Sequence, residues 1–291
     1  MIEARLTGSA GSEGGVALKD QYIEIENLKI RYWNAGSGQS CVILIHGLGG
    51  YVENWEKNIA SLSKNHRVFA LDLPGFGRSA KPGDRFSISY WAAFVQKFMR
   101  MLEIERAALV GASMGGAIAL QFALRYPQQV ERLILSGSAG LGYEVAPFLR
   151  LVAVPILGER LSRPSRAGSE QFWKEIVQDQ RLISDPLVDL DFELSSLPGS
   201  QRSFLKALRT LVNIWGAKKD SITPILDHLE EILVPTLILW GAQDRFLPVA
   251  HAHNAVKRIR NASLHIFDPC GHIPNYERAD EFNSMVVDFL A

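Results

Sequence analysis

Cysteine and net charge are the two things that this sequence of 291 residues most clearly lacks. Its only two cysteines, Cys41 and Cys270, are far apart, which excludes a disulfide framework and a C-x-x-C metal site. Its 31 Lys and Arg residues balance 31 Asp and Glu residues, so no net field draws the chain to nucleic acid or to an anionic membrane surface. We therefore expect a cytoplasmic protein with a small-molecule partner and no nucleic-acid partner.

A long hydrophobic run is also missing. The most apolar stretch, "LRLVAVPILGERL" at 149–161, is interrupted by Arg150, Pro155 and Glu159 and is shorter than the ~20 apolar residues that a membrane span needs. Residues 1–20 lack the apolar segment of a secretory signal and are rich in Gly and Ser, so they predict a flexible N-terminal arm. The chain nevertheless contains 47% hydrophobic residues, which is enough to form a large buried core.

Short runs of Val, Ile and Leu alternate with helical patterns along most of the chain. The first two runs alternate apolar with polar residues, whereas the later ones are apolar throughout, as strands covered on both faces are. The expected strands are 22–27, 28–33, 41–46, 67–71, 107–111, 132–136, 235–240 and 263–267, and the expected helices are 53–63, 87–103, 114–126, 249–258 and 277–290. This order predicts an α/β fold, with a mostly parallel eight-stranded sheet flanked by helices.

Residues 141–232 interrupt this alternation with helical patterns and no clear strand. Six prolines divide the block into short helices, so we expect a helical cap inserted into a core made of residues 21–140 and 233–291. The apolar side chains of Phe148, Leu151 and Trp173 are expected to line an acyl pocket, together with Ile273. Packing of the cap against the core, or a dimer interface, would account for the same apolar surface.

The motif that says most about function is "GASMG" at 111–115, between an apolar run and a long helical pattern. It matches G-x-S-x-G, in which a tight turn from strand to helix projects the serine hydroxyl outward. Ser113 is therefore the candidate nucleophile. The alternative is that Ser113 only caps the following helix, since serine is common at that position.

A serine nucleophile needs a base and a group that orients the base. Functional groups of a parallel sheet gather where strands end, and Asp244 and His272 each follow an expected strand. The chain order Ser113, Asp244, His272 is the order in which this kind of site presents nucleophile, acid and base. Asp268 is the nearest competitor for the acid and is better placed to support the turn before His272.

Two backbone amides must also hold the oxyanion that forms on the substrate. Met114, directly after the nucleophile, should supply one. Leu48 should supply the other from "HGLGG" at 46–50, which follows the strand at 41–46, while His46 braces that loop. The alternative is that these glycines form only a turn.

Together with "DLPGFGRS" at 72–79, "WGAQDRFLP" at 240–248 and "CGHIPNYERADEF" at 270–282, these motifs resemble the α/β-hydrolase fold superfamily over nearly the whole chain. Within it, the sequence resembles serine hydrolases of the meta-cleavage product group, which cut carbon–carbon bonds in dienoate ketoacids. It is also similar to carboxylesterases and monoacylglycerol lipase-like members. The resemblance implies no metal and no organic cofactor.

Two positions depart from the carbon–carbon group. That group usually has Trp after the catalytic histidine, where this chain has Ile273, and it carries an Arg in the cap where this chain has Asp191. Because an acid would repel an anionic ketoacid, the sequence predicts a carboxylic-ester hydrolase that acts on short to medium acyl chains through an acyl-serine. A carbon–carbon hydrolase and a non-catalytic small-molecule receptor are the alternatives, and both a monomer and a homodimer stay open.

Overall fold

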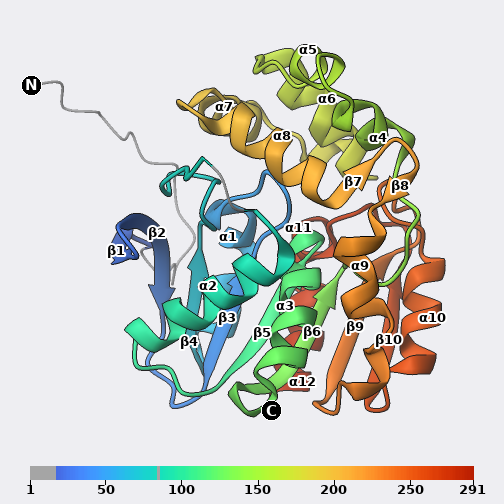
Figure 1. The fold of residues 1–291 in the computed structure, drawn as a ribbon. Coiled ribbons are helices and arrows are strands. Elements are labelled where there is room, and N and C mark those ends of the chain that lie inside the picture. Colours follow the sequence, from blue (N-terminus) through green and yellow to red (C-terminus); the bar gives the residue numbers. More distant parts are fainter. Residues whose placement is uncertain (1–17, 84–85) are drawn as a thin grey trace, which may run out of the picture.

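The computed structural model describes residues 18–83 and 86–291 (Figure 1). Most of the expected N-terminal arm, residues 1–17, lies outside the described residues. The last part of it is attached to the core, because Leu18 packs against buried side chains and Trp33 donates a hydrogen bond of 2.7 Å to the Asp20 carboxylate. Within the described ranges, no helix is long and apolar enough to cross a membrane.

One eight-stranded sheet forms the centre of the molecule, with the strand order β1-β2-β4-β3-β5-β6-β9-β10. β1 pairs with β2, and β2 with β4, in antiparallel fashion, whereas all other neighbours in this sheet are parallel. The predicted α/β fold with a mostly parallel eight-stranded sheet is thus confirmed. The strands are β1 Gln21–Ile25, β2 Leu28–Ala35, β3 Cys41–Ile45, β4 Arg67–Leu71, β5 Ala107–Ala112, β6 Val130–Ser136, β9 Thr236–Gly241 and β10 Ala262–Phe267.

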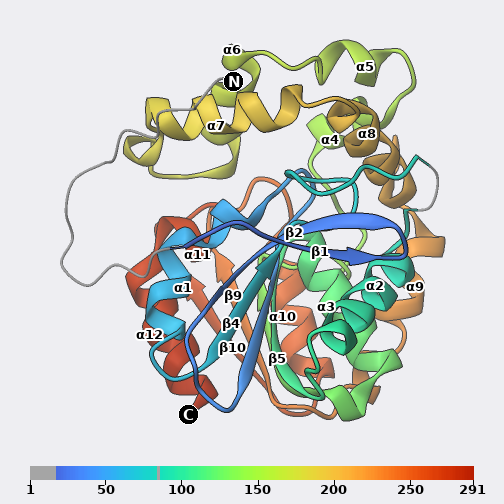
Figure 2. The same ribbon diagram turned by 90° about the vertical axis from the view of Figure 1, so that its left-hand side faces the viewer.

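Helices cover both faces of this sheet (Figures 1 and 2). Alternate residues of the central strands point to opposite faces, so Val42 and Leu44 join one buried cluster while Ile43 and Ile45 join the other. The first face is covered by α1 (Glu56–Leu62) and α12 (Ala279–Leu290). The second is covered by α2 (Ile88–Met101), α3 (Met114–Arg125) and α10 (Ala250–Arg258). Short helical turns occur at η1 Val52–Trp55, η2 Pro127–Gln129, η3 Gln180–Leu182, η4 Leu229–Glu231 and α11 Pro274–Glu277.

Five helices of the 141–232 block lie together over one end of the core (Figures 1 and 2). They are α4 Pro147–Ala153, α5 Leu157–Leu161, α6 Arg166–Ile176, α7 Asp185–Ser196 and α8 Ser200–Leu211. The block differs from the sequence expectation in two respects. It contains a small hairpin of β7 (Val212–Asn213) and β8 (Gly216–Ala217), where the sequence shows no clear strand. Its helix α9 (Lys219–Leu226) packs against α3 and carries Pro224 in its interior, although the prolines of this block were expected to separate helices.

Candidate active site

Ser113 occupies a sharp turn between β5 and α3. Its backbone has φ 54° and ψ −119°, a region that non-glycine residues rarely adopt and that is held only by a constraining environment. The two flanking glycines allow this turn, because a β-carbon on Gly111 would lie 2.3 Å from the Gly115 carbonyl oxygen, and one on Gly115 would lie 2.1 Å from that of Ile45. The sequence pattern therefore reflects a steric requirement at both positions.

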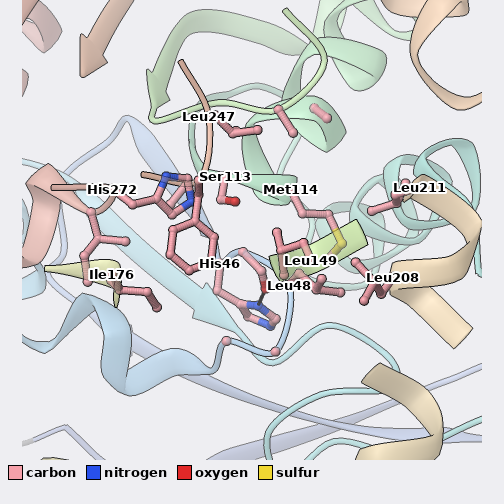
Figure 3. A pocket seen from close by; sticks show the side chains of 18 of the residues that line it. His46, Leu48, Ser113, Met114, Leu149, Ile176, Leu208, Leu211, Leu247 and His272 are labelled. Atoms are coloured by element: carbon pink, nitrogen blue, oxygen red, sulfur yellow. Dashed lines mark hydrogen bonds between the residues drawn. The ribbon is translucent and has the colours of Figure 1, made fainter. Parts of the chain in front are cut away.

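The backbone of Ser113 joins three segments. Its N–H donates to the Ser136 carbonyl at 2.9 Å, and its own carbonyl accepts from Ala139 at 2.9 Å. In the part of the chain that the structure describes, its side chain makes no capping hydrogen bond to α3 and instead lines a cavity with His272 (Figure 3). This arrangement does not favour the alternative in which the hydroxyl serves only as a helix cap.

The Asp244 and His272 side chains contact each other, and His272 lines this cavity. His272 Nδ1 lies 2.8 Å from Asp244 Oδ2, and both side chains are buried. The second carboxylate oxygen of Asp244 accepts the N–H groups of Phe246 at 2.8 Å and Leu247 at 3.0 Å. With Nδ1–H donated to Asp244, Nε2 of His272 is the nitrogen left to accept a proton. Such a pair can act as base and orienting acid.

Competing residues for these two roles are engaged elsewhere. Asp268 accepts a hydrogen bond of 2.8 Å from the Gln243 side chain and so supports the turn, as the sequence indicates. His251 Nε2 lies 2.7 Å from Glu144, and His265 Nε2 lies 3.2 Å from Glu281. Within the described residues, no group of three or more His, Cys, Asp or Glu side chains is arranged to hold a metal ion.

The two amides proposed for oxyanion binding lie on opposite sides of Ser113 in the chain but line one cavity (Figure 3). Met114 is the first residue of α3, so its N–H has no partner within the helix. The loop that carries Leu48 approaches closely at Gly47, where a β-carbon would lie 3.0 Å from Ser113 Cβ and 3.6 Å from its Oγ. A larger residue at 47 would therefore crowd the Ser113 side chain.

His46 braces this loop through both ring nitrogens. Nδ1 lies 2.7 Å from the Gly47 carbonyl oxygen, and Nε2 accepts the Leu73 N–H at 3.0 Å. Complete burial lowers the pKa of His46 to about 4, because the charged imidazolium would lose its hydration. A neutral ring is also the only form in which Nε2 can accept the Leu73 N–H.

The cavity has a volume of about 1240 Å³, part of which is open to solvent. Two of the four predicted substrate-binding residues, Trp173 and Ile273, line it. The other two do not: Phe148 and Leu151 lie three residues apart on α4 and are 45% and 47% exposed. Leu149 is the residue of α4 that faces this cavity, whereas Phe148 lines a second cavity between the cap and the core loops that carry Tyr51 and Phe76.

Two further residues hold the His272 loop and were missed in the sequence. The Phe246 ring stacks on the His272 imidazole, with 4.9 Å between the centroids and 17° between the planes. The Glu277 carboxylate accepts the N–H groups of Gly271 on that loop and of Gln178 and Asp179 after α6, the last at 2.7 Å. Only the nearness of Glu277 to His272 in the sequence could have indicated this contact, because its partners after α6 are about a hundred residues away.

The family described as alpha/beta hydrolase fold matches residues 41–279, and the chain belongs to this family. Within it, the chain is 35% identical to a 2-hydroxy-6-oxononadienedioate/2-hydroxy-6-oxononatrienedioate hydrolase of Comamonas testosteroni, over 92% of this chain and 93% of the relative. It is also 35% identical, over the same shares, to a 2-hydroxy-6-oxo-6-phenylhexa-2,4-dienoate hydrolase of that organism. The solved meta-cleavage product hydrolase of Pseudomonas fluorescens IP01 superposes with a TM-score of 0.79 at 31% identity, covering 93% of this chain and 97% of that one.

These relatives confirm the resemblance to the superfamily and to its carbon–carbon hydrolases, and they support the assignment as a hydrolase. They also correct one prediction. The expectation of a carboxylic-ester hydrolase is wrong, because relatives that match over nine tenths of the chain are named for the hydrolysis of meta-cleavage products. The error came from Ile273 and Asp191, on which the sequence argument for an ester depended. The candidate nucleophile, base and oxyanion amides suit both reactions, so they do not distinguish between them.

Proposed function

We propose that this protein hydrolyses a carbon–carbon bond next to a ketone, in a conjugated 2-hydroxy-6-oxo-2,4-diene of the meta-cleavage type. The observation that carries the proposal is the 35% identity, over 92% of the chain, to relatives named for such substrates. The cavity supports it, because a serine, a histidine held by a buried carboxylate and two backbone amides meet beside apolar walls. A cytoplasmic location and a homodimer stay predictions.

The bond that breaks lies between C5 and the C6 ketone carbon. Its electron pair needs an acceptor, and the substrate supplies one when the 2-hydroxy enol moves its proton to C5 and becomes a 2-oxo group. Ser113 Oγ then adds to C6 while His272 Nε2 takes the hydroxyl proton, and Asp244 stabilises the imidazolium that results. The Met114 and Leu48 N–H groups stabilise the oxyanion.

Collapse of this intermediate breaks the C5–C6 bond. The electron pair passes through the C3–C4 double bond to the C2 oxygen, which takes the proton from His272 and leaves as a 2-hydroxy-2,4-diene. The C6 fragment stays on Ser113 as an ester. Water, activated by His272, releases it as a carboxylic acid and restores the serine.

The test is to incubate the protein with 2-hydroxy-6-oxo-6-phenylhexa-2,4-dienoate and, separately, with its primary amide. Loss of the conjugated absorbance gives the rate, and mass spectrometry identifies benzoate. Ser113→Ala should lower kcat by about 10⁴ to 10⁶. Ser63→Ala, which removes a buried hydroxyl bonded to the Ala60 carbonyl on α1, should not change kcat. If neither ketone yields benzoate, the proposal is overturned.

A further inference from the structure

One side of the cap exposes apolar side chains that the proposed reaction does not use. Among the described residues, ten large hydrophobic side chains are exposed, and seven of these lie in α4, in α5 with the turn before it, or in the β7–β8 hairpin. The seven are Phe148, Leu151, Ile156, Leu157, Leu161, Ile214 and Trp215. Trp215 is 87% exposed and Ile156 is 72% exposed. Apolar side chains concentrated in this way indicate an interaction site, whereas scattered ones do not.

The elements that carry these side chains are neighbours in the fold. α4 packs against α5, α8 and β7, and Figure 1 shows α4, α5 and the hairpin along one side of the cap. Phe148 and Leu151 are one helical turn apart on α4, so they share a face. Phe148 and Leu161 also line the same second cavity. The seven side chains therefore belong to one surface, which we call the cap face.

The elements of the cap face are rich in basic residues. Residues 147–163 and 200–219, which include α4, α5, α8 and the hairpin, contain eight Lys and Arg residues and one acid, Glu159. Glu159 is paired with Arg209 at 2.7 Å. The eight basic residues are Arg150, Arg160, Arg163, Arg202, Lys206, Arg209, Lys218 and Lys219. The zero net charge of the whole chain thus conceals a local positive charge, and the expectation that no field draws the chain to an anionic membrane does not hold for this face.

Some of these charges are exposed next to the apolar side chains. Arg160 directly precedes Leu161, and Arg163 follows it by two residues. Both arginines are exposed, and within the part of the chain that the structure describes neither forms an ion pair. Only two acids, Glu144 and Asp220, border the basic ranges, which is too few to cancel the excess. The cap face therefore combines apolar side chains with available positive charge.

We propose that the cap face binds the surface of a membrane that contains anionic lipids. The apolar side chains enter the boundary between headgroups and acyl chains, where tryptophan is favoured. The Lys and Arg side chains contact the lipid phosphates. Both contributions strengthen the binding, because interfacial affinity grows with buried apolar area and with attraction to anionic lipids.

A second copy of this chain fits the same face less well. A twofold interface places the same surface on both subunits, so the basic residues of one copy would face the basic residues of the other. Like charges that oppose each other across an interface lower the affinity. An anionic bilayer instead offers negative charge and an apolar interior together.

The cap face also borders the second cavity. Phe148 and Leu161, which are 45% and 48% exposed, line this cavity of about 930 Å³, part of which is open to solvent. The second cavity adjoins the catalytic cavity, because five residues line both: Gly49, Tyr51, Phe172, Asp191 and Phe204. Binding by the cap face therefore places the second cavity next to the lipid.

Co-sedimentation of the full chain with vesicles at low salt tests the proposal. One set of vesicles is made of phosphatidylcholine, and the other of equal parts phosphatidylcholine and phosphatidylglycerol. We expect binding to the anionic vesicles to be at least about 10-fold tighter than to the phosphatidylcholine vesicles. Trp215→Ser should weaken binding to the anionic vesicles on the order of 10-fold. Arg160→Gln combined with Arg163→Gln should weaken it on the order of 10- to 100-fold.

Two controls change similar side chains at the end of the sheet away from the cap. Met101→Ser matches Trp215→Ser, because Met101 is the last residue of α2 and is 52% exposed. Arg100→Gln combined with Arg106→Gln matches the arginine pair, since both side chains are exposed and Arg106 directly precedes β5. Neither control should change the affinity for anionic vesicles.

Three results overturn the proposal. The first is a wild-type chain that does not bind anionic vesicles or binds both kinds equally. The second is unchanged binding by Trp215→Ser or by the arginine pair. The third is a dimer that dissociates in Trp215→Ser while no vesicles are bound, because that result assigns the face to a second copy. The experiment measures no turnover, so its outcome is independent of the proposed function.

Discussion

The neutral state of His46 makes a specific prediction about stability and pH. In the folded protein its pKa is lowered to about 4, whereas the ordinary value of 6.5 applies when the chain unfolds. The unfolded chain therefore binds a proton more readily as the pH falls below 6.5. The stability that depends on neutral His46 is fully present above pH 6.5 and is lost as the pH falls toward 4. Protonation would also remove the acceptor of the Leu73 N–H.

The size of the effect follows from the two pKa values. Since one pKa unit corresponds to about 1.4 kcal/mol, the full loss is about 3 kcal/mol, and at pH 5 about 2 kcal/mol of it is reached. Asp72 acts in the opposite direction over part of this range. Burial raises its pKa to about 6, so its folded form gains relative stability as the pH falls. The wild-type profile alone therefore does not isolate His46.

The assay compares wild type with His46→Gln by equilibrium urea unfolding at pH 7 and pH 5. The glutamine side chain can accept the Leu73 N–H but does not titrate. We expect the stability advantage of wild type over the variant to shrink by about 2 kcal/mol between pH 7 and pH 5. His228→Gln is the control: Glu231 raises the pKa of that exposed histidine, so its contribution has the opposite sign. An advantage that is equal at both pH values refutes the reasoning.

Two more predictions concern the wall of the cavity and the His272 loop. Trp173→Phe should change KM for the phenyl ketone several-fold, because Trp173 lines the cavity. Leu151→Ala, at a side chain that is 47% exposed, should leave KM unchanged. Steady-state kinetics measure both, and equal effects on KM would contradict this orientation. Glu277→Gln should lower the free energy of unfolding by about 1 to 3 kcal/mol, since the Glu277 carboxylate accepts three N–H groups that join the end of α6 to the His272 loop. The same variant should reduce kcat more than it raises KM. An unchanged unfolding midpoint would contradict this prediction.

The core of the fold could be predicted because several independent signals agree there. Strands buried on both faces need continuous apolar runs, and the turn at Ser113 needs glycines at 111 and 115, where a β-carbon would meet a carbonyl oxygen. Both Asp244 and Asp268 follow a strand, and Asp244 could be preferred because Asp268 is better placed to support the turn before His272, although only the structure shows Asp244 beside His272. These features depend on local sequence and on the order of strands, which the sequence records directly.

The cap is less predictable for a reason that α4 illustrates. Its sequence "PFLRLVA" is apolar around most of its circumference, so helical periodicity does not decide which side turns inward. The choice between Leu149 and its neighbours Phe148 and Leu151 depends on how α4 packs with α5, α8 and β7. The contact between Glu277 and the segment after α6 is equally invisible, since it joins residues about a hundred positions apart.

The choice between ester and carbon–carbon hydrolysis lies in the same unpredictable part of the molecule. An ester leaves as an alkoxide, which needs only a proton from His272, whereas a carbon leaving group also needs an electron acceptor within the substrate. In the proposed reaction, the protein must hold that acceptor in conjugation with the breaking bond while Ser113 attacks. The walls of the cavity include cap and loop residues far from Ser113 in the sequence, Asp191 and Tyr51 among them. Substitutions at Ser113, Asp244 or His272 should therefore abolish both kinds of hydrolysis, and only substitutions among these cap and loop residues should change one relative to the other.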